Sequence, residues 1–263
     1  MPILGRTFYV ITAPKDVAAV YKASTVLAFT SFLNEALRAF GVDDSSLKLA
    51  WHTPNPGDAC YSDTNPVNPK QKPFVHWMKD IYRQQLLPGE KMNFMADRFR
   101  QYIDERLQWK SISSFDLKAS ESNGSVHLSL KEFARTIMLE AITDSLFGTC
   151  LTKVEPDLIK YVEEFNDDAW MLVHRYPKLF AGRAYGNRKK ILAALDRYRQ
   201  LPQEKRTAGG ESWAVETMMI EHDILGMSNK SNNAFLMLIH WAYVGGAVPI
   251  SIISRLTKEQ SRF

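Results

Sequence analysis

The segment AFLMLIHWAYVGGAVPISIIS, which runs from Ala234 to Ser254, contains no Asp, Glu, Lys or Arg. About 20 apolar residues are enough for a helix to cross the hydrocarbon core of a bilayer. The segment also contains residues that a simple membrane anchor does not need, namely His240, Trp241, Gly245, Gly246 and Pro249. It is therefore either a membrane-spanning helix or a helix buried in a protein core, and this choice constrains the whole fold.

The composition narrows the class of protein. Of 263 residues, 45% are hydrophobic and 24% are charged, which is typical of a folded globular domain. The net charge of +4 is spread along the chain without a dense basic block, so nucleic-acid binding is not expected. No charged segment followed by an apolar run opens the chain, so neither a signal peptide nor an N-terminal anchor is expected. Two cysteines, Cys60 and Cys150, exclude a disulfide framework and a cysteine-based zinc cluster.

Most of the chain follows helical periodicity. The clearest helix runs from Ser129 to Gly148, where apolar residues recur at i, i+3 and i+4. Ser129 and Glu132 have the spacing of a capping box, and a glycine closes the other end. Another helix is expected to begin at Pro156, with Trp170 and its other apolar residues facing inward. Further helices are expected over residues 14–23, 25–40, 74–87, 90–109, 184–201 and 211–225.

Two regions depart from this periodicity. Thr7–Thr12 is rich in β-branched and aromatic residues and predicts a strand. Asp43–Pro73 contains five prolines among Asn, Asp and Ser residues and predicts a long irregular loop. The sequence therefore predicts one mainly α domain over residues 1–263, with a small β element near its N-terminus.

The sequence offers no self-contained active site. It contains no P-loop, no GxGxxG and no GxSxG, and its six histidines form neither an i, i+4 pair nor an HExxH motif. No catalytic residue and no metal ligand is therefore assigned from these patterns.

Four segments, taken in order, resemble the N-terminal half of the cytochrome P450 family. FYVITAPKDVAAVYKA resembles the family's early strand and B helix, and LKEFARTIMLEAITDSLFG resembles its E helix. WMLVHRYPKLFAGRAYGNRKKILAAL is similar to the F-helix passage. NNAFLMLIHWAYVGGAVP resembles the I helix, which passes over the haem. The resemblance implies the N-terminal part of a P450-like helical fold.

The I-helix-like segment is closest to the branch that includes sterol 7α-hydroxylases and prostacyclin synthase. Trp241, Ala242 and Pro249 match its Trp-Ala…Asn…Pro pattern, whereas Gly246 stands where Asn is expected and Ala247 where Thr is expected. The family's acid–Thr pair, which delivers protons to bound oxygen, is absent from the segment. The resemblance implies that small residues let the haem approach the helix backbone, and these residues are Ala242, Gly245, Gly246 and Ala247.

The resemblance also implies a reaction and its partners. The family is an oxidoreductase that uses haem iron as a monooxygenase, acts on a lipophilic small molecule and receives electrons from a reductase. Members of this branch are associated with the endoplasmic reticulum membrane, and the same location is expected here.

The features that bind haem in the family are missing. Neither Cys60 nor Cys150 lies in the family's Phe-x-x-Gly…Cys-x-Gly loop, and no WxxxR for the haem propionates occurs; Arg83 and Lys91 are the alternatives. Two matches to the family's ExxR spacing are best explained as ordinary helical pairs, namely Glu35–Arg38 and Glu132–Arg135.

These absences predict a truncated, inactive P450 fragment. In such a fragment the apolar helix would be covered by a domain half that the chain lacks, and the polar tail RLTKEQSRF would not continue it. The alternative is a non-enzymatic helical protein that is tail-anchored in a membrane through Ala234–Ser254.

Overall fold

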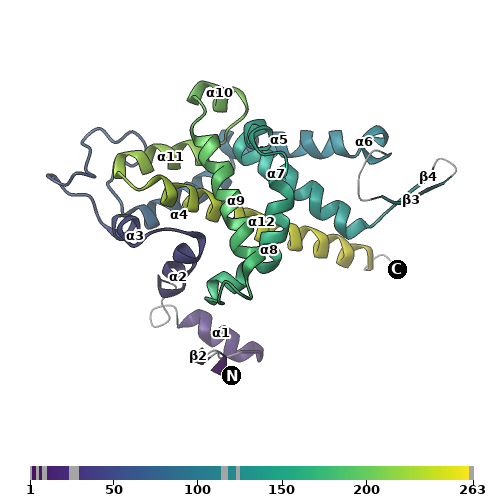
Figure 1. Cartoon of the computed structure of the whole chain (residues 1–263), viewed down its shortest axis with the longest axis horizontal. Helices are drawn as coiled ribbons and strands as arrows, with labels where there is room; N and C mark the ends of the chain where they lie inside the picture. Colours follow the sequence, from purple (N-terminus) through teal and green to yellow (C-terminus); the bar gives the residue numbers. More distant parts are fainter. Residues whose placement is uncertain are drawn as a thin grey trace.

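The computed structural model describes residues 2–3, 6–7, 11–23, 30–113, 118–122 and 125–260, which are mostly helical (Figure 1). The helices are α1 Pro14–Lys22, α2 Thr30–Phe40, α3 Asp44–Trp51, α4 Phe74–Leu86, α5 Glu90–Arg106, α6 Trp109–Ser113, α7 Leu130–Val154, α8 Leu158–Val173, α9 Gly182–Arg199, α10 Gln203–Ala208, α11 Trp213–Leu225 and α12 Asn229–Gln260. The strands form two antiparallel pairs, β1 Pro2–Ile3 with β2 Arg6–Thr7 and β3 Lys118–Ser122 with β4 Ser125–Leu128. The mainly α fold class is confirmed.

The longest helix, α12, organises the others. It runs along the long axis of the molecule and packs against α2, α7, α8, α9 and α11 (Figure 1). Helices α8 and α9 form an antiparallel pair across it, and α5 packs along α7 on one side of the bundle. The hydrophobic core therefore lies where α12 crosses α7, α8 and α9.

The apolar segment that begins at Ala234 supplies much of this core. Every residue from Ala234 to His240 is buried, and so is Val244. Phe235 makes edge-on contact with the ring of Phe74 from α4, with ring centroids 5.0 Å apart. The expectation that this segment needs cover from outside the chain is therefore wrong for Ala234–His240, because other helices of the chain cover these residues.

The end of α12 also differs from the expectation. The polar tail was predicted not to continue the apolar helix, yet α12 extends to Gln260. Tail residues such as Arg255, Lys258 and Gln260 have good helix propensity, and a polar sequence does not by itself end a helix. Within the described residues, no helix has both the length and the apolar character that a membrane span requires.

The capped start of α7 is confirmed, and its end is more complex than predicted. The hydroxyl of Ser129 accepts a hydrogen bond from the backbone N–H of Glu132 at 3.4 Å. Gly148 has φ +64° and interrupts the helix, which then continues to Val154. A Cβ at Gly148 would lie 2.2 Å from the carbonyl oxygen of Gly209, so only glycine fits there.

The region Asp43–Pro73 contains a helix that was not predicted. Its residues 44–51 form α3, which is capped by Asp43: the Asp43 carboxylate accepts a hydrogen bond from the backbone N–H of Ser46 at 2.8 Å. The cluster of Asp and Ser residues was interpreted as loop, but such residues are equally typical of a helix start. From His52 to Pro73 the chain is irregular, as expected.

Smaller predictions also differ from the structure. The strand expected over Thr7–Thr12 is described only at its first residue, in β2; residues 11 and 12 are not in a strand, and residues 8–10 lie outside the described part. Trp170 was expected to point inward but is 47% exposed, whereas its helix neighbours Phe165 and Ala169 are buried. The β3–β4 hairpin was not predicted, because its sequence is polar and lacks the alternation that marks a half-buried strand.

Candidate functional site

The four residues expected to face a haem all lie in α12. The side chain of Ala242 is exposed, although its neighbours from Ala234 to His240 are buried. Gly245, Gly246 and Ala247 follow it in the helix, but their surroundings lie outside the described side chains. Ala242 is therefore the one residue of the four whose accessibility is described.

Two aromatic residues flank Ala242 and pack against different helices. The ring of Trp241 lies edge-on to Phe40 of α2, with centroids 5.4 Å apart. The ring of Tyr243 stacks on Tyr82 of α4, with centroids 5.2 Å apart. Burial raises the pKa of both tyrosines well above the ordinary value, so both hydroxyls stay protonated and remain potential donors.

These flanking residues carry unpaired donors. The indole N–H of Trp241 and the hydroxyl of Tyr243 are both shielded from water, and neither has a hydrogen-bond partner within the described part of the chain. Buried polar groups normally are paired. Two unpaired donors therefore lie beneath the surface, on either side of a small, accessible residue.

Neither cysteine fits an axial thiolate for a haem at this surface. Both thiols are buried, whereas Ala242 is exposed. The sulfur of Cys150 lies 3.4 Å from the carbonyl oxygen of Lys205, next to α10. Cys60 lies in the loop after α3, and burial raises the pKa of its thiol. No catalytic step through a haem thiolate follows from these residues.

The two cations considered as propionate ligands lie in different surroundings. Arg83 is exposed on α4. Lys91, at the start of α5, lies over the ring of Trp213 at 3.1 Å from its centroid, and its ammonium is 3.2 Å from the side-chain oxygen of Gln84. Burial lowers the pKa of Lys91. The structure thus assigns Lys91 to a cation–π contact.

Lys91 also lines a cleft of about 600 Å³. Its walls come from the loop before α4, from α4 itself and from Trp213. The lining residues are Pro66, Val67, Asn68, Pro69, Lys70, Lys72, Trp77, Asp80, Gln84, Lys91 and Trp213. Asp80 is the acidic residue of this lining and is ion-paired with Lys72, which leaves the positive charges of Lys70 and Lys91 in the cleft.

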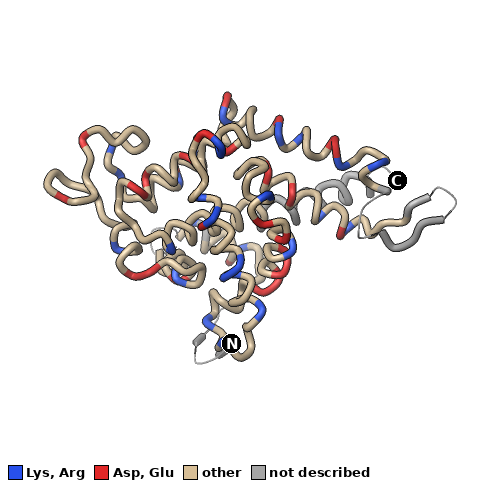
Figure 2. Tube along the Cα trace, turned by 45° about the horizontal axis from the view of Figure 1, so that its top comes forward, with Lys and Arg blue, Asp and Glu red and all other residues tan. Residues whose placement is uncertain are grey.

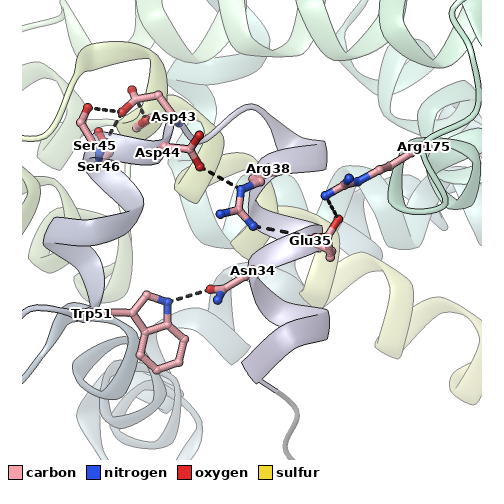
Figure 3. A network of polar contacts seen from close by, with 10 residues as sticks. Asn34, Glu35, Arg38, Asp43, Asp44, Ser45, Ser46, Trp51 and Arg175 are labelled. Carbon is pink, nitrogen blue, oxygen red and sulfur yellow. Dashed lines mark hydrogen bonds and ion pairs between the residues drawn. The ribbon is translucent and has the colours of Figure 1, made fainter.

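A second cleft, of about 620 Å³, lies between α2 and α3 (Figure 3). It is lined by Asn34, Arg38, Asp44, Leu47, Lys48, Trp51 and His52. Arg38 donates to Asp44 at 2.9 Å, and the indole N–H of Trp51 donates to the side-chain oxygen of Asn34 at 2.7 Å. These bonds join the two helices across the cleft.

The two ExxR matches differ in the structure. Arg38 lies 3.8 Å from Glu35 in the same helix, as expected of a helical pair, and Glu35 also pairs with Arg175 just after α8 (Figure 3). Arg135 instead pairs with Asp167 of the neighbouring helix α8 at 2.8 Å. The expected pair of Glu132 with Arg135 is therefore replaced by a contact between helices.

A network around Asp43 fixes the start of α12 to α3. The Asp43 carboxylate accepts hydrogen bonds from the hydroxyls of Ser228 and Ser231 as well as from Ser45 and the backbone of Ser46. Burial acts to raise the pKa of Asp43, but these hydrogen bonds outweigh it and hold the pKa well below the usual range. The carboxylate therefore stays ionised and has a structural role.

The loop after α3 brings three potential metal ligands together. One donor atom each from His52, Asp58 and Cys60 lies within 4.8 Å of the others. Neither a helical spacing nor a zinc motif marks this group in the sequence. The sequence pattern that could have indicated it is three donor residues within nine positions of a loop that contains Pro and Gly. These residues come together only because the loop turns.

The distribution of charged residues does not indicate a binding surface. Basic and acidic residues are interspersed along the described helices (Figure 2).

Compared with models of protein families and with curated proteins, the chain matches neither a family nor a protein.

Proposed function

We propose that the chain provides the helical framework of a haem-binding protein that resembles the cytochrome P450 monooxygenases, whose reaction oxidises a lipophilic small molecule. The observation that carries the proposal is the surface of α12 at residues 241–243. An accessible Ala242 lies there between two buried donors, Trp241 and Tyr243, that lack partners among the described residues. A flat, mainly apolar group such as haem would fit against the small side chain of Ala242, next to these two donors.

The position of α12 supports the same proposal. A long helix at the centre of the bundle, packed against α2, α7, α8, α9 and α11, agrees with the resemblance of its sequence to the family's I helix. The segments that resemble the E helix and the F-helix passage are helical as well, in α7 and in α8–α9. Electron supply by a reductase and association with the endoplasmic reticulum membrane are part of this proposal.

Haem binding at Ala242 is tested by titrating the chain with haemin. Replacing Ala242 with Trp places a bulky ring at the surface and should weaken binding at least about tenfold, which corresponds to about 1.4 kcal/mol. Ala208→Trp, at an exposed position in α10, is the matched control and should bind like the unmodified chain. Equal affinity of both variants would place any haem elsewhere, and no binding by the unmodified chain would remove the proposal.

The identity of the protein ligand to the haem iron is tested on the chain after reconstitution with haem. A thiolate ligand gives the reduced, carbon monoxide-treated protein the absorption band after which the family is named. We expect this band to be absent, because both thiols are buried away from the exposed Ala242. A thiolate-type band that disappears in Cys60→Ser or in Cys150→Ser would show that one of them binds iron.

The alternative is a non-enzymatic protein anchored in a membrane through Ala234–Ser254. The burial of Ala234–His240 within the chain's own core weighs against it, since a span needs those side chains in lipid. Carbonate extraction of membranes separates the two: an anchored chain stays with the lipid, and a chain with this segment in its core is released.

A further inference from the structure

The loop between α3 and α4 holds three donor side chains close together. His52 Nε2 lies 2.7 Å from Asp58 Oδ2, and the sulfur of Cys60 completes a group in which all three donor atoms lie within 4.8 Å of one another. His52 and Asp58 are partly accessible, with side chains 43% and 36% exposed, whereas Cys60 is 6% exposed. The group thus extends from the surface to the edge of the core.

The loop is held in this conformation by its own backbone. The N–H of Asp58 donates to the carbonyl of Asn55 at 3.0 Å, and the N–H of Tyr61 donates to the carbonyl of Asp58 at 3.1 Å. The N–H of Asn55 also donates to the Asp58 carboxylate at 2.8 Å. Gly57 has φ +101°, which other residues rarely adopt. The turn that aligns the donors is therefore built before any ligand binds.

The surroundings of Cys60 are electronegative. The carboxylates of Asp58 and Glu221 both act on Cys60 electrostatically. Glu221 is buried in α11, accepts hydrogen bonds from the side-chain amides of Asn65 and Asn68 at 2.8 Å each, and forms no ion pair with Lys or Arg in the described ranges. A cation bound beside Cys60 would balance these negative charges.

We propose that His52 Nε2, Asp58 Oδ2 and Cys60 Sγ bind one zinc ion, with water as the fourth ligand. Zinc is bound in proteins by imidazole, carboxylate and thiolate together, whereas Mg²⁺ and Ca²⁺ prefer oxygen ligands only. Three protein ligands and an open position are typical of zinc sites that keep a water. His52 also lines the cleft between α2 and α3, so the site lies at the edge of that cleft.

The geometry needs only a small adjustment. Tetrahedral zinc with bonds of about 2.0–2.3 Å holds its ligand atoms roughly 3.3–3.6 Å apart. His52 and Asp58 must therefore separate slightly, and the sulfur of Cys60 must move inward by roughly 1 Å. On binding, the thiol of Cys60 loses its proton to solvent, and His52 binds the ion through an unprotonated Nε2, with its ring proton on Nδ1.

The test uses Co²⁺ as a spectroscopic substitute for zinc on the metal-free, reduced full chain. We expect one equivalent of Co²⁺ to produce a thiolate-to-cobalt charge-transfer band in the near ultraviolet, and zinc to displace it. The band should be lost in Cys60→Ser and kept in Cys150→Ser, which makes the second cysteine an internal control. A missing band in the unmodified chain, or a band that survives in Cys60→Ser, would overturn the proposal.

Variants of the other two ligands test the remaining contacts. His52→Gln and Asp58→Asn keep the side-chain size and should each weaken zinc binding at least about tenfold, since even partners outside the first coordination shell contribute that much. His76→Gln, at an exposed histidine of α4, is the matched control and should bind as the unmodified chain does. Circular dichroism confirms that each variant is folded, and unchanged affinity in both ligand variants would contradict the assignment.

Discussion

Helices α12 and α5 belong to the same bundle but are held in it by different forces. Along Ala234–His240, α12 contributes a continuous run of buried and mainly apolar side chains. None of the 17 residues of α5 is buried, and its contacts with α7 include the ion pair of Arg98 with Asp144 at 2.6 Å. Nearby, the hydroxyl of Tyr102 donates to Glu140 at 3.0 Å.

The difference shows that helical structure alone does not reveal how much a segment stabilises the fold. Burial of a large apolar side chain contributes roughly 1.5–3 kcal/mol, whereas a partly exposed ion pair contributes roughly 1 kcal/mol or less. We therefore expect changes in α12 to affect the whole molecule and changes in α5 to act locally.

Removing residues 230–263 should have the largest effect. Among the described side chains, the deletion takes away six that are large, buried and apolar, at Phe235, Leu236, Met237, Leu238, Ile239 and Val244. At roughly 1.5–3 kcal/mol for each buried side chain, the lost stabilisation is roughly 10 kcal/mol or more. This is comparable with the whole stability of a typical domain. Circular dichroism and size-exclusion chromatography should show lost helical signal and aggregation. A soluble, helical shortened chain would mean that the other helices form a core without α12.

A single substitution in α12 should cost less but still destabilise the entire chain. Phe235 is fully buried and contacts Phe74 and His222, so Phe235→Ala should lower the free energy of unfolding by about 3–5 kcal/mol. The matched control is Phe180→Ala, at a phenylalanine that is 71% exposed, with an expected change below about 0.5 kcal/mol. Urea unfolding monitored by circular dichroism measures both, and equal effects would contradict the comparison.

Buried histidines should make the same core sensitive to pH. Burial lowers the pKa of His222 to about 3 and that of His240 to about 4, from an ordinary value of 6.5. Below pH 6.5 the unfolded chain binds protons that these folded-state residues do not, so their contribution to stability falls with pH until the folded-state values are reached. Between pH 6 and pH 4, each of these histidines should lower the free energy of unfolding by about 1.4 kcal/mol for every unit by which the pH falls.

The sign and origin of this effect are checked by a variant. His222→Gln should reduce the slope of unfolding free energy against pH by about 1.4 kcal/mol per unit in that range. His174→Gln, at an exposed histidine, should leave the slope unchanged. If the two variants gave the same slope, protonation of His222 could not be the cause.

The contacts of α5 should give the smallest change. Arg98→Met leaves the Asp144 carboxylate unpaired in a partly buried position, where its side chain is 13% exposed, and should cost about 1–2 kcal/mol. Arg100→Met removes a fully surface pair with Asp97, in which both side chains are 69% exposed, and should change stability by less than about 0.5 kcal/mol. A loss in Arg98→Met as large as that in Phe235→Ala would remove the distinction between the helices.

The sequence predicted those parts of the fold in which local signals agree. The cap at Ser129 and the periodic residues of α7 were recognisable, because capping and packing favour the same helix. Helix α3 was missed because Asp43 and its Ser neighbours are typical of loops as well as of helix starts. The inward position predicted for Trp170 is wrong because spacing alone does not show where neighbouring helices end.

The candidate sites were less predictable for a related reason. Ala242 could be named from its resemblance to a family pattern, but its exposure and the unpaired donors beside it depend on contacts with α2 and α4, which are distant in sequence. The cluster of His52, Asp58 and Cys60 depends on the turn at Gly57, and no regular spacing marks it. Both sites arise from tertiary structure.

Amide hydrogen exchange, measured by mass spectrometry on the unmodified chain, compares the two helices most directly. Peptides that cover residues 234–244 should exchange only through global unfolding, because most of their side chains, with the exception of Ala242, belong to the core or pack against it. Peptides that cover Glu90–Arg106 should exchange faster, through local opening that breaks the contacts with α7. If residues 234–244 exchanged as fast as α5, or faster, α12 would not be the central core element of this chain, and the account would be contradicted.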